Sequence, residues 1–440
     1  MIARDSPLDH VTPYDRFAWS DTQIEQWLAE GAHAAELGAY FGAAEYRDLA
    51  RLARRARRAG LSPAALRVFV VPGIMGSQLG LLRRAPLPND ILWLDPIDIQ
   101  LGRLAALRLP AAAPIVPLGA VLYSYLRLKL HLRAHGFAAE FHDYDWRLSV
   151  ADLGRAFAER LRAASAGRIA IVAHSMGGLV ARAALALPGT RHIERVILLG
   201  SPNRGSFAAV QALRGTYAVV RKVARLSRSS AEALAAEVFN TFPSLYDLLP
   251  SDSGDGGTNL LETSAWPRSG PQPRAELLQQ AQRTPGLLAS PDARFAVIVG
   301  VGEETVTAVT RRRDDFVYTL TRHGDGTVPA ASAALAGARS VYARAAHSDL
   351  TRDPRVAAAV VDLLHRGSTR RLPERWVSSS RARARVSDAQ LRRTHARKVD
   401  WAALQPDARR QFLQNLNEPP QFRLRVPGGR ARPRSAAKRN

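Results

Sequence analysis

The sequence predicts an α/β fold built on a doubly wound, mostly parallel sheet with helices on both faces. Short apolar runs rich in β-branched residues are typical of buried parallel strands, and they occur at 66–73, 168–175 and 191–202. Amphipathic helical patterns alternate with these runs, at 119–136, 151–167 and 176–187. Further strands are expected at 137–144, 293–302, 315–321 and 339–345. The 440 residues are 46% hydrophobic, which is enough apolar material for a large core.

The domain organisation follows from where this alternation starts and stops. Residues 1–63 carry apolar residues at three- and four-residue spacings and are expected to form an N-terminal helical extension. The α/β domain is expected over 64–366, closed by a helix at 353–367. Within it, residues 203–290 lose the alternation, so we expect a cap-like insertion that lies over the sheet. From 367 to 440 the chain is Arg-rich and weakly periodic, which indicates a partly disordered C-terminal tail.

The composition excludes several classes of protein. The chain has no cysteine, so it cannot form disulfides or thiolate metal sites, and this fits a reducing compartment. The N-terminal segment MIARDSPLDHVTPYDRF lacks the apolar stretch of a secretory signal peptide. The sequence has no run of about 18 apolar residues, which is the length that a membrane-spanning helix requires. We therefore expect a cytoplasmic protein, and the sequence carries no motif that would indicate a metal or a cofactor.

Positive charge is concentrated toward the C-terminal end. The formal net charge is +23, and residues 366–440 hold 20 Lys and Arg against 5 Asp and Glu. Such a segment can attract anionic membrane or nucleic acid. Its aromatic residues are sparse and it contains no recognisable base-reading module. A solvated tail is therefore the simpler interpretation, and weak contact with anionic lipid or nucleic acid is the alternative.

Ser175 is the predicted nucleophile. It lies in Ala-His-Ser-Met-Gly, between an apolar strand pattern and an Ala-rich helix pattern, which is the placement of a nucleophile elbow. The sharp turn of an elbow requires small residues two positions before and after the serine, and Ala173 and Gly177 supply them, although glycine is commoner at the first position. His174 is interpreted as a packed residue, since its adjacency to Ser175 would point it away from the hydroxyl.

An acid and a base are expected downstream of the nucleophile. A serine is activated by a base that an acid orients, and in an elbow fold the chain order is Ser, acid, His. His347 follows a predicted strand and precedes the closing helix, so its loop can reach over the sheet edge. Asp325 lies in Gly-Asp-Gly-Thr-Val-Pro, where flanking glycines permit a tight turn that exposes the carboxylate. Asp325 and His347 are therefore the predicted acid and base.

Two backbone N–H groups are expected to form an oxyanion hole. The elbow points the Met176 N–H toward the place where negative charge develops. The segment Val-Pro-Gly-Ile-Met-Gly follows the first core strand, and the loop at this position normally supplies the second donor. Within that segment we expect the Ile74 N–H to be the donor.

These segments together resemble the lecithin:cholesterol acyltransferase-like family of α/β-hydrolase serine lipases and acyltransferases. The resemblance spans residues 66–365 and rests on the motifs PGIMGSQL, ILWLDP, YDWRL, AHSMGG, LGSPNRGS, PSLYDLLP and GDGTVP. It implies an α/β-hydrolase fold with a cap or lid, and ester or acyl-lipid substrates. It implies a triad of Ser175, Asp325 and His347 with oxyanion donors Ile74 and Met176. Secreted eukaryotic members tether the lid with a disulfide, which a chain without cysteine cannot form.

Three other residues in these motifs are candidates for lid or substrate contacts. Trp93 can pack as an anchor of the lid or touch the substrate. Asp145 and Arg147 can form a structural ion pair or contact a polar group of the substrate. We favour the structural role for all three and keep substrate contact as the alternative.

Three functions stay open at this point. Hydrolysis of a carboxylic, lipid-like ester through an acyl-enzyme on Ser175 is favoured. Transfer of the acyl group to an alcohol uses the same acyl-enzyme, so the triad does not separate transfer from hydrolysis. The third is a vestigial hydrolase that binds membrane or nucleic acid through its basic tail.

Overall fold

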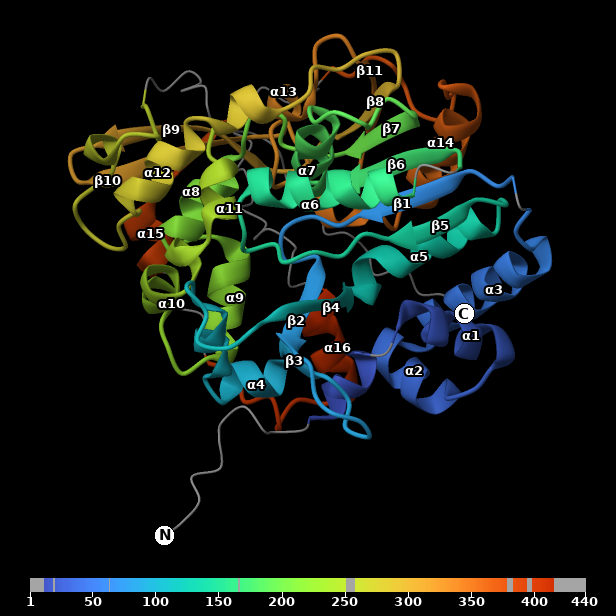
Figure 1. The fold of residues 1–440 in the computed structure, drawn as a ribbon. Helices are drawn as coiled ribbons and strands as arrows, with labels where there is room; N and C mark the ends of the chain where they lie inside the picture. The colour runs from blue at the N-terminus through green and yellow to red at the C-terminus, as the bar shows by residue number, and fades with distance from the viewer. Residues whose placement is uncertain are drawn as a thin grey trace, which may run out of the picture.

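A six-stranded parallel sheet forms the centre of the molecule (Figure 1). The computed structural model describes residues 12–18, 20–62, 64–164, 167–250, 258–377, 383–393 and 398–414. The strand order is β11-β8-β7-β6-β1-β5. These strands are β1 (Arg67–Val71), β5 (Ala138–Phe141), β6 (Ile169–His174), β7 (Ile193–Leu199), β8 (Phe295–Gly300) and β11 (Arg339–Ala343). The α/β fold predicted from the sequence is confirmed.

The inner strands β1, β6, β7 and β8 bury residues on both faces of the sheet, because successive side chains of a strand point in opposite directions. Along β6, Ile169, Ile171 and Ala173 join one apolar cluster. Ala170 and Val172 join the other. Both faces are therefore covered, which explains why the strand is a continuous apolar run in the sequence.

Helices provide the two covers. α6 (Val150–Ala163) and α7 (Met176–Leu185) lie on one face and contact each other along their lengths. α5 (Leu122–Arg133) and α14 (Pro354–Arg366) lie on the other face. α14 ends at Gly367, which adopts a left-handed conformation with φ 70°, as the sequence predicts for the end of the closing helix.

Two antiparallel sheets of three strands accompany the central sheet. The sheet β3-β2-β4 follows β1 in the chain and contains β2 (Ser77–Leu81), β3 (Asp90–Trp93) and β4 (Val116–Ala120). The sheet β12-β10-β9 contains β9 (Thr305–Arg312), β10 (Asp315–Thr321) and β12 (Ala384–Ser387). β10 is the strand expected at 315–321, but it lies outside the parallel sheet. Its burial alternates along much of the strand, which is typical of an antiparallel strand packed mainly on one side.

The chain between β7 and β8 is helical wherever it forms regular structure in the described residues. Its α-helices are α8 (Phe207–Leu213), α9 (Ala218–Leu226), α10 (Ala231–Glu237), α11 (Pro243–Asp247) and α12 (Ala275–Ala281). Its 3₁₀ turns are η3 (Phe239–Thr241), η5 (Thr263–Ala265) and η6 (Thr284–Leu287). Val210, Val223 and Leu245 from these helices pack in the same cluster as α7. A cap role for 203–290, like the other domain boundaries, stays a prediction.

Short helical pieces complete the loops around the sheets. They are η1 (Pro13–Ala18), α4 (Pro96–Gln100), η2 (Arg103–Leu107), α13 (Ala330–Ala333) and η7 (His347–Asp349). Asp95 caps α4, because its carboxylate accepts from the backbone N–H groups of Ile97 and Asp98.

Three helices form the N-terminal part of the chain and pack beside α5 (Figure 1). They are α1 (Asp21–Glu30), α2 (Ala34–Phe41) and α3 (Ala43–Ala59). Ile24, Leu28 and Leu49 of these helices join the apolar cluster that includes α5 and α14. In the described part of the chain, no helix combines the length and hydropathy that crossing a bilayer requires.

The chain beyond Gly367 contributes regular structure to the fold. The sequence predicts that residues 371–388 are extended or disordered. In the structure, β12 lies within this segment and pairs with β10. It is followed by α15 (Asp388–Arg393) and α16 (Pro406–Gln414). Residues 415–440 lie outside the described residues. Contact of the tail with anionic membrane or nucleic acid stays a prediction.

Trp401 joins the C-terminal segment to the start of the chain. Its side chain is 2% exposed, and its ring lies 6.2 Å from the ring of Tyr14 and 5.9 Å from that of Phe412. Two segments about 390 positions apart in sequence therefore share one apolar contact, which is worth several kcal/mol when the aromatic side chain is fully buried.

We expect Trp401→Ala to lower the free energy of unfolding by about 3 kcal/mol, because the change leaves a cavity where a buried indole packs. Urea titration followed by far-UV circular dichroism measures it. Val377→Ala is the control, since Val377 is 85% exposed and its loss should change stability very little. Equal stability of both variants would contradict the packing of this segment.

Candidate active site

Ser175 occupies a sharp turn between β6 and α7. β6 ends at His174 and α7 begins at Met176, so the serine is the single residue between strand and helix. Its backbone has φ 54° and ψ −130°, a conformation that residues other than glycine rarely adopt. Strain of this kind persists only where the surrounding structure holds it, and both β6 and α7 are almost completely buried. The structure thus has the elbow geometry that the sequence predicts.

The structure brings Ser175, His347 and Asp325 together in one line of hydrogen bonds. The Nε2 atom of His347 lies 2.9 Å from Ser175 Oγ, and its Nδ1 atom lies 2.8 Å from Asp325 Oδ2. The Asp325 carboxylate is fully buried, so a proton on Nδ1 is the arrangement that satisfies it. The lone pair on Nε2 then faces the serine hydroxyl and can accept its proton.

Backbone groups hold the Asp325 carboxylate in place. Its second oxygen, Oδ1, accepts from the N–H groups of Thr327 at 2.9 Å and Val328 at 2.7 Å. The backbone N–H of His347 donates to the Asp325 carbonyl oxygen at 2.8 Å, which joins the two loops directly. The carboxylate thus accepts three hydrogen bonds, two from backbone N–H groups and one from His347, and these fix its orientation.

Gly200 leaves room for the acid and the base at the end of β7. It adopts φ 55°, and a Cβ atom placed there would lie 3.0 Å from Asp325 Oδ2 and 3.3 Å from His347 Nδ1. A side chain would crowd the hydrogen bond between those two atoms. Gly200 belongs to the motif LGSPNRGS, but its steric role is visible only in three dimensions.

The loop that carries Ile74 lies directly against the nucleophile. A Cβ atom on Gly73 would come within 2.7 Å of the Ser175 Cβ atom. Met176, the first residue of α7, has a backbone N–H with no acceptor inside its own helix. Both predicted oxyanion donors therefore lie beside Ser175, and their role in binding an oxyanion stays a prediction.

Aromatic side chains with polar groups fix this loop. Tyr144 donates its hydroxyl proton to the Pro72 carbonyl at 2.6 Å. The Nε1–H of Trp93 donates to the Met75 carbonyl at 3.0 Å, and that of Trp146 donates to the Ser77 carbonyl at 3.0 Å. All three aromatic side chains are buried. They immobilise the segment from which the Ile74 N–H would act.

The three candidate contact residues lie inside the fold. Trp93 is 1% exposed and packs edge-on against Trp146 at 5.4 Å. Arg147 pairs with Asp145 through Nε at 2.8 Å and Nη2 at 2.6 Å, and it also donates to the Leu107 carbonyl at 2.9 Å. This is the geometry of the structural role that we favour for these residues. Their contact with a substrate stays a prediction.

A second line of hydrogen bonds runs behind the nucleophile and joins the loop of Ile74 to the loop of His347. The Gly73 N–H donates to Tyr125 Oη at 2.9 Å, and Tyr125 Oη lies 2.9 Å from His174 Nδ1. The Nε2 atom of His174 lies 3.0 Å from the His347 carbonyl oxygen. His174 is therefore more than the packed residue expected from the sequence, because it contacts the base loop.

The protonation states of this second line are set by burial. Burial, followed by the proximity of His347, lowers the pKa of His174 well below its usual value, so the imidazole is neutral. Burial raises the pKa of Tyr125, so its hydroxyl stays protonated. Tyr125 then donates to His174 Nδ1, and His174 donates from Nε2 to the His347 carbonyl. Every group in the line has a partner of the correct kind.

Comparison with known families confirms the resemblance that the motifs indicate. Residues 124–284 match the family model described as lecithin:cholesterol acyltransferase. The matched part contains Ser175 and ends before Asp325 and His347. No curated protein matches the chain.

Several solved structures are similar to the chain at low sequence identity. The lipase BlEst2 of Bacillus licheniformis in its mature form is 14% identical with a TM-score of 0.37, over 70% of this chain and 95% of that one. The Tle4–Tli4 complex gives 12% identity and a TM-score of 0.36, over 68% and 98%. The lin2722 gene product of Listeria innocua gives 12% and 0.29, over 70% and 96%.

We expect Tyr125→Phe to slow the reaction of Ser175 with a fluorophosphonate by about tenfold, since the Gly73 N–H and His174 Nδ1 both lose a buried partner. Single-exponential labelling rates of the purified protein measure it. Tyr123→Phe on the same helix is the control, because Tyr123 stacks on Tyr40 at 4.3 Å, away from this line. Identical rates for the two variants would show that the second line does not position the site.

Proposed function

Because residues 124–284 match the family model described as lecithin:cholesterol acyltransferase and the chain folds as an α/β hydrolase, we propose that it is a serine hydrolase of carboxylic esters. The observation that carries the proposal is the position of His347, whose two ring nitrogens lie within hydrogen-bond distance of Ser175 Oγ and Asp325 Oδ2. The family match supports an acyl-lipid as the source of the ester.

The first half of the proposed reaction forms an acyl-enzyme. Ser175 Oγ attacks the ester carbonyl while His347 Nε2 takes its proton. Asp325 keeps the imidazole in the required tautomer and stabilises the imidazolium that forms. The N–H groups of Ile74 and Met176 donate to the oxygen of the tetrahedral intermediate. His347 then gives its proton to the departing alcohol, and the acyl group stays on Ser175.

The second half releases the acyl group to an acceptor. Water enters where the alcohol left, His347 removes its proton, and the attack regenerates Ser175 and frees a carboxylic acid. An alcohol can enter in the same position and yield a new ester. The triad serves both acceptors equally, so hydrolysis and acyl transfer differ only in what reaches the acyl-enzyme. We favour water, because hydrolysis requires no dedicated acceptor pocket.

We expect Ser175→Ala to abolish covalent labelling by a fluorophosphonate, since the change removes the only atom that would bond to phosphorus. Intact-protein mass spectrometry measures the adduct. Ser201→Ala is a matched control, because Ser201 is another buried serine and directly follows Gly200. Adduct formation that persists in Ser175→Ala would overturn the assignment of the nucleophile.

We expect short-chain nitrophenyl esters to yield free carboxylic acid as the main product, with or without an added long-chain alcohol. Chromatography of the products at equal nitrophenol release separates acid from new ester. A new ester as the main product in the presence of the alcohol would identify the chain as an acyltransferase, with the same acyl-enzyme.

A further inference from the structure

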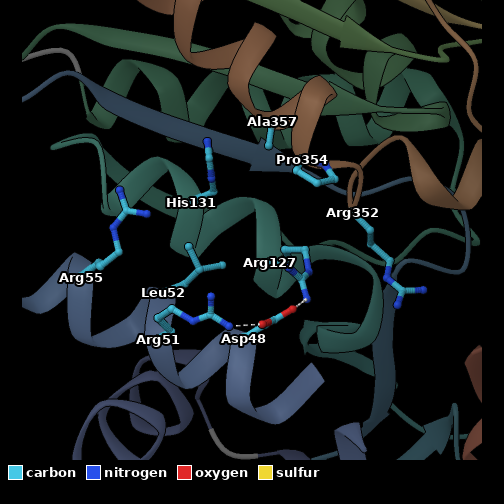
Figure 2. A pocket seen from close by; sticks show the side chains of 9 residues that line it. All are labelled: Asp48, Arg51, Leu52, Arg55, Arg127, His131, Arg352, Pro354 and Ala357. Atoms are coloured by element: carbon cyan, nitrogen blue, oxygen red, sulfur yellow. Dashed lines mark hydrogen bonds and ion pairs between the residues drawn. The ribbon is translucent and has the colours of Figure 1, made fainter. Parts of the chain in front are cut away.

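A basic pocket lies between α3, α5 and the start of α14, apart from the site described above (Figure 2). Its volume is about 200 Å³. The residues that line it are Asp48, Arg51, Leu52, Arg55, Arg127, His131, Arg352, Pro354 and Ala357. Four arginines and one aspartate therefore face a space smaller than the roughly 300–1,000 Å³ of most small-molecule pockets.

Carboxylates on α3 hold part of this wall in a fixed position. Arg127 donates to Glu45 through Nε at 3.0 Å and Nη2 at 2.7 Å, and it also reaches Asp48 at 3.2 Å. Figure 2 shows Asp48 between Arg51 and Arg127, joined to both. With Glu45 counted, four positive charges still face two negative ones. The carboxylates orient the arginines and leave the pocket positive.

The other arginines and a histidine of the wall have unused donors. Arg55 is exposed and makes no hydrogen bond or ion pair in the described part of the chain, so its donors are open to a ligand. Arg352 approaches Glu45 at 4.0 Å, yet its Nε atom is buried without a hydrogen-bond partner among the described residues. The Nε2 atom of His131 is also buried without a hydrogen-bond partner among the described residues. Buried donors without partners are rare in folded proteins, and a bound acceptor is one way to satisfy them.

The pKa of His131 reflects both its burial and the positive groups around the pocket. Burial is the main cause that lowers its pKa to about 4, and the positive charges of His135, Arg55, Arg127 and Arg371 add to it. The imidazole is therefore neutral near pH 7, and one of its tautomers carries a proton on Nε2 that can be donated. Burial by itself disfavours a charge of either sign, and it is the surrounding positive groups that would attract an anion.

We propose that this pocket binds a phosphate group. Its donors come from three separate segments of the chain, and a tetrahedral anion presents oxygen acceptors in several directions at once. Guanidinium groups match the spacing of two phosphate oxygens, so Arg55 can bind one pair while His131 and Arg352 approach the others. The phosphate can come from a soluble phosphate ester or from the headgroup of an anionic lipid. This inference does not depend on the chemistry at Ser175.

Isothermal titration calorimetry of the full chain with inorganic phosphate, at constant ionic strength, tests the proposal. We expect saturable binding at one site, and binding about tenfold weaker in Arg55→Gln, because one charge-assisted hydrogen-bond donor is lost. Arg58→Gln is the matched control, since it removes the same charge from an exposed arginine of the same helix that does not line the pocket. Arg58→Gln should bind phosphate as the unmodified chain does.

Two results would overturn the proposal: an unmodified chain that shows no saturable binding, or equal weakening in both variants, which would indicate attraction by net charge alone. Unchanged melting temperatures would show that Arg55→Gln and Arg58→Gln fold alike. Glycerol 3-phosphate and short-chain phosphatidic acid distinguish the two sources, both titrated in the Ser175→Ala background so that no ester is cleaved. Tighter binding of the lipid identifies a headgroup site, and equal binding identifies a soluble phosphate site.

Discussion

The hydrogen bond between His347 and Ser175 joins two positions 172 residues apart in the chain. Its 2.9 Å length requires that the ends of β6 and β11, which lie at different places in the sheet, be fixed to within a fraction of an ångström. The parallel sheet supplies this precision, because β7 and β8 lie between those two strands and are buried on both faces. A rigid scaffold of this kind allows irregular loops to hold reactive groups in register.

The backbone strain at Ser175 and the missing side chain at Gly200 both help to place His347 within hydrogen-bond distance of Ser175. The elbow lifts the serine above the end of β6 at a cost in backbone energy, and the well-packed helices α6 and α7 offset that cost. At the neighbouring strand end, the lack of a side chain on Gly200 admits the imidazole and the carboxylate. Tyr125 and His174 then connect the loops on either side of the nucleophile. The site is therefore held from two directions: by Asp325 on one side of His347 and by His174 on its carbonyl.

Much of this could be predicted from the sequence, because the signals involved are local. Alternating apolar strands and amphipathic helices indicate the parallel sheet, and the residues around Ser175 carry the elbow in five consecutive positions. The line from Tyr125 to His174 could not be predicted, since its two residues are 49 positions apart and neither belongs to a motif that requires the other. The pairing of β12 with β10 could not be predicted from the sequence either. The four residues of β12, Ala-Arg-Val-Ser, alternate apolar and polar side chains, but so short a run does not distinguish a strand from a loop, and contact with a distant strand makes it regular.

The N-terminal helices illustrate how charge, rather than apolar pattern alone, attaches a segment to its domain. Lys129 on α5 is 2% exposed, and a buried ammonium without partners would be strongly unfavourable. Glu25 of α1 lies 2.7 Å from it, and Asp21 of the same helix is a second partner. Removing α1 would therefore do more than expose apolar surface, because it would leave a buried charge without compensation. The helix α5 also carries Tyr125, so the element to which the N-terminal helices are paired by charge is the one that contacts the loop beside Ser175.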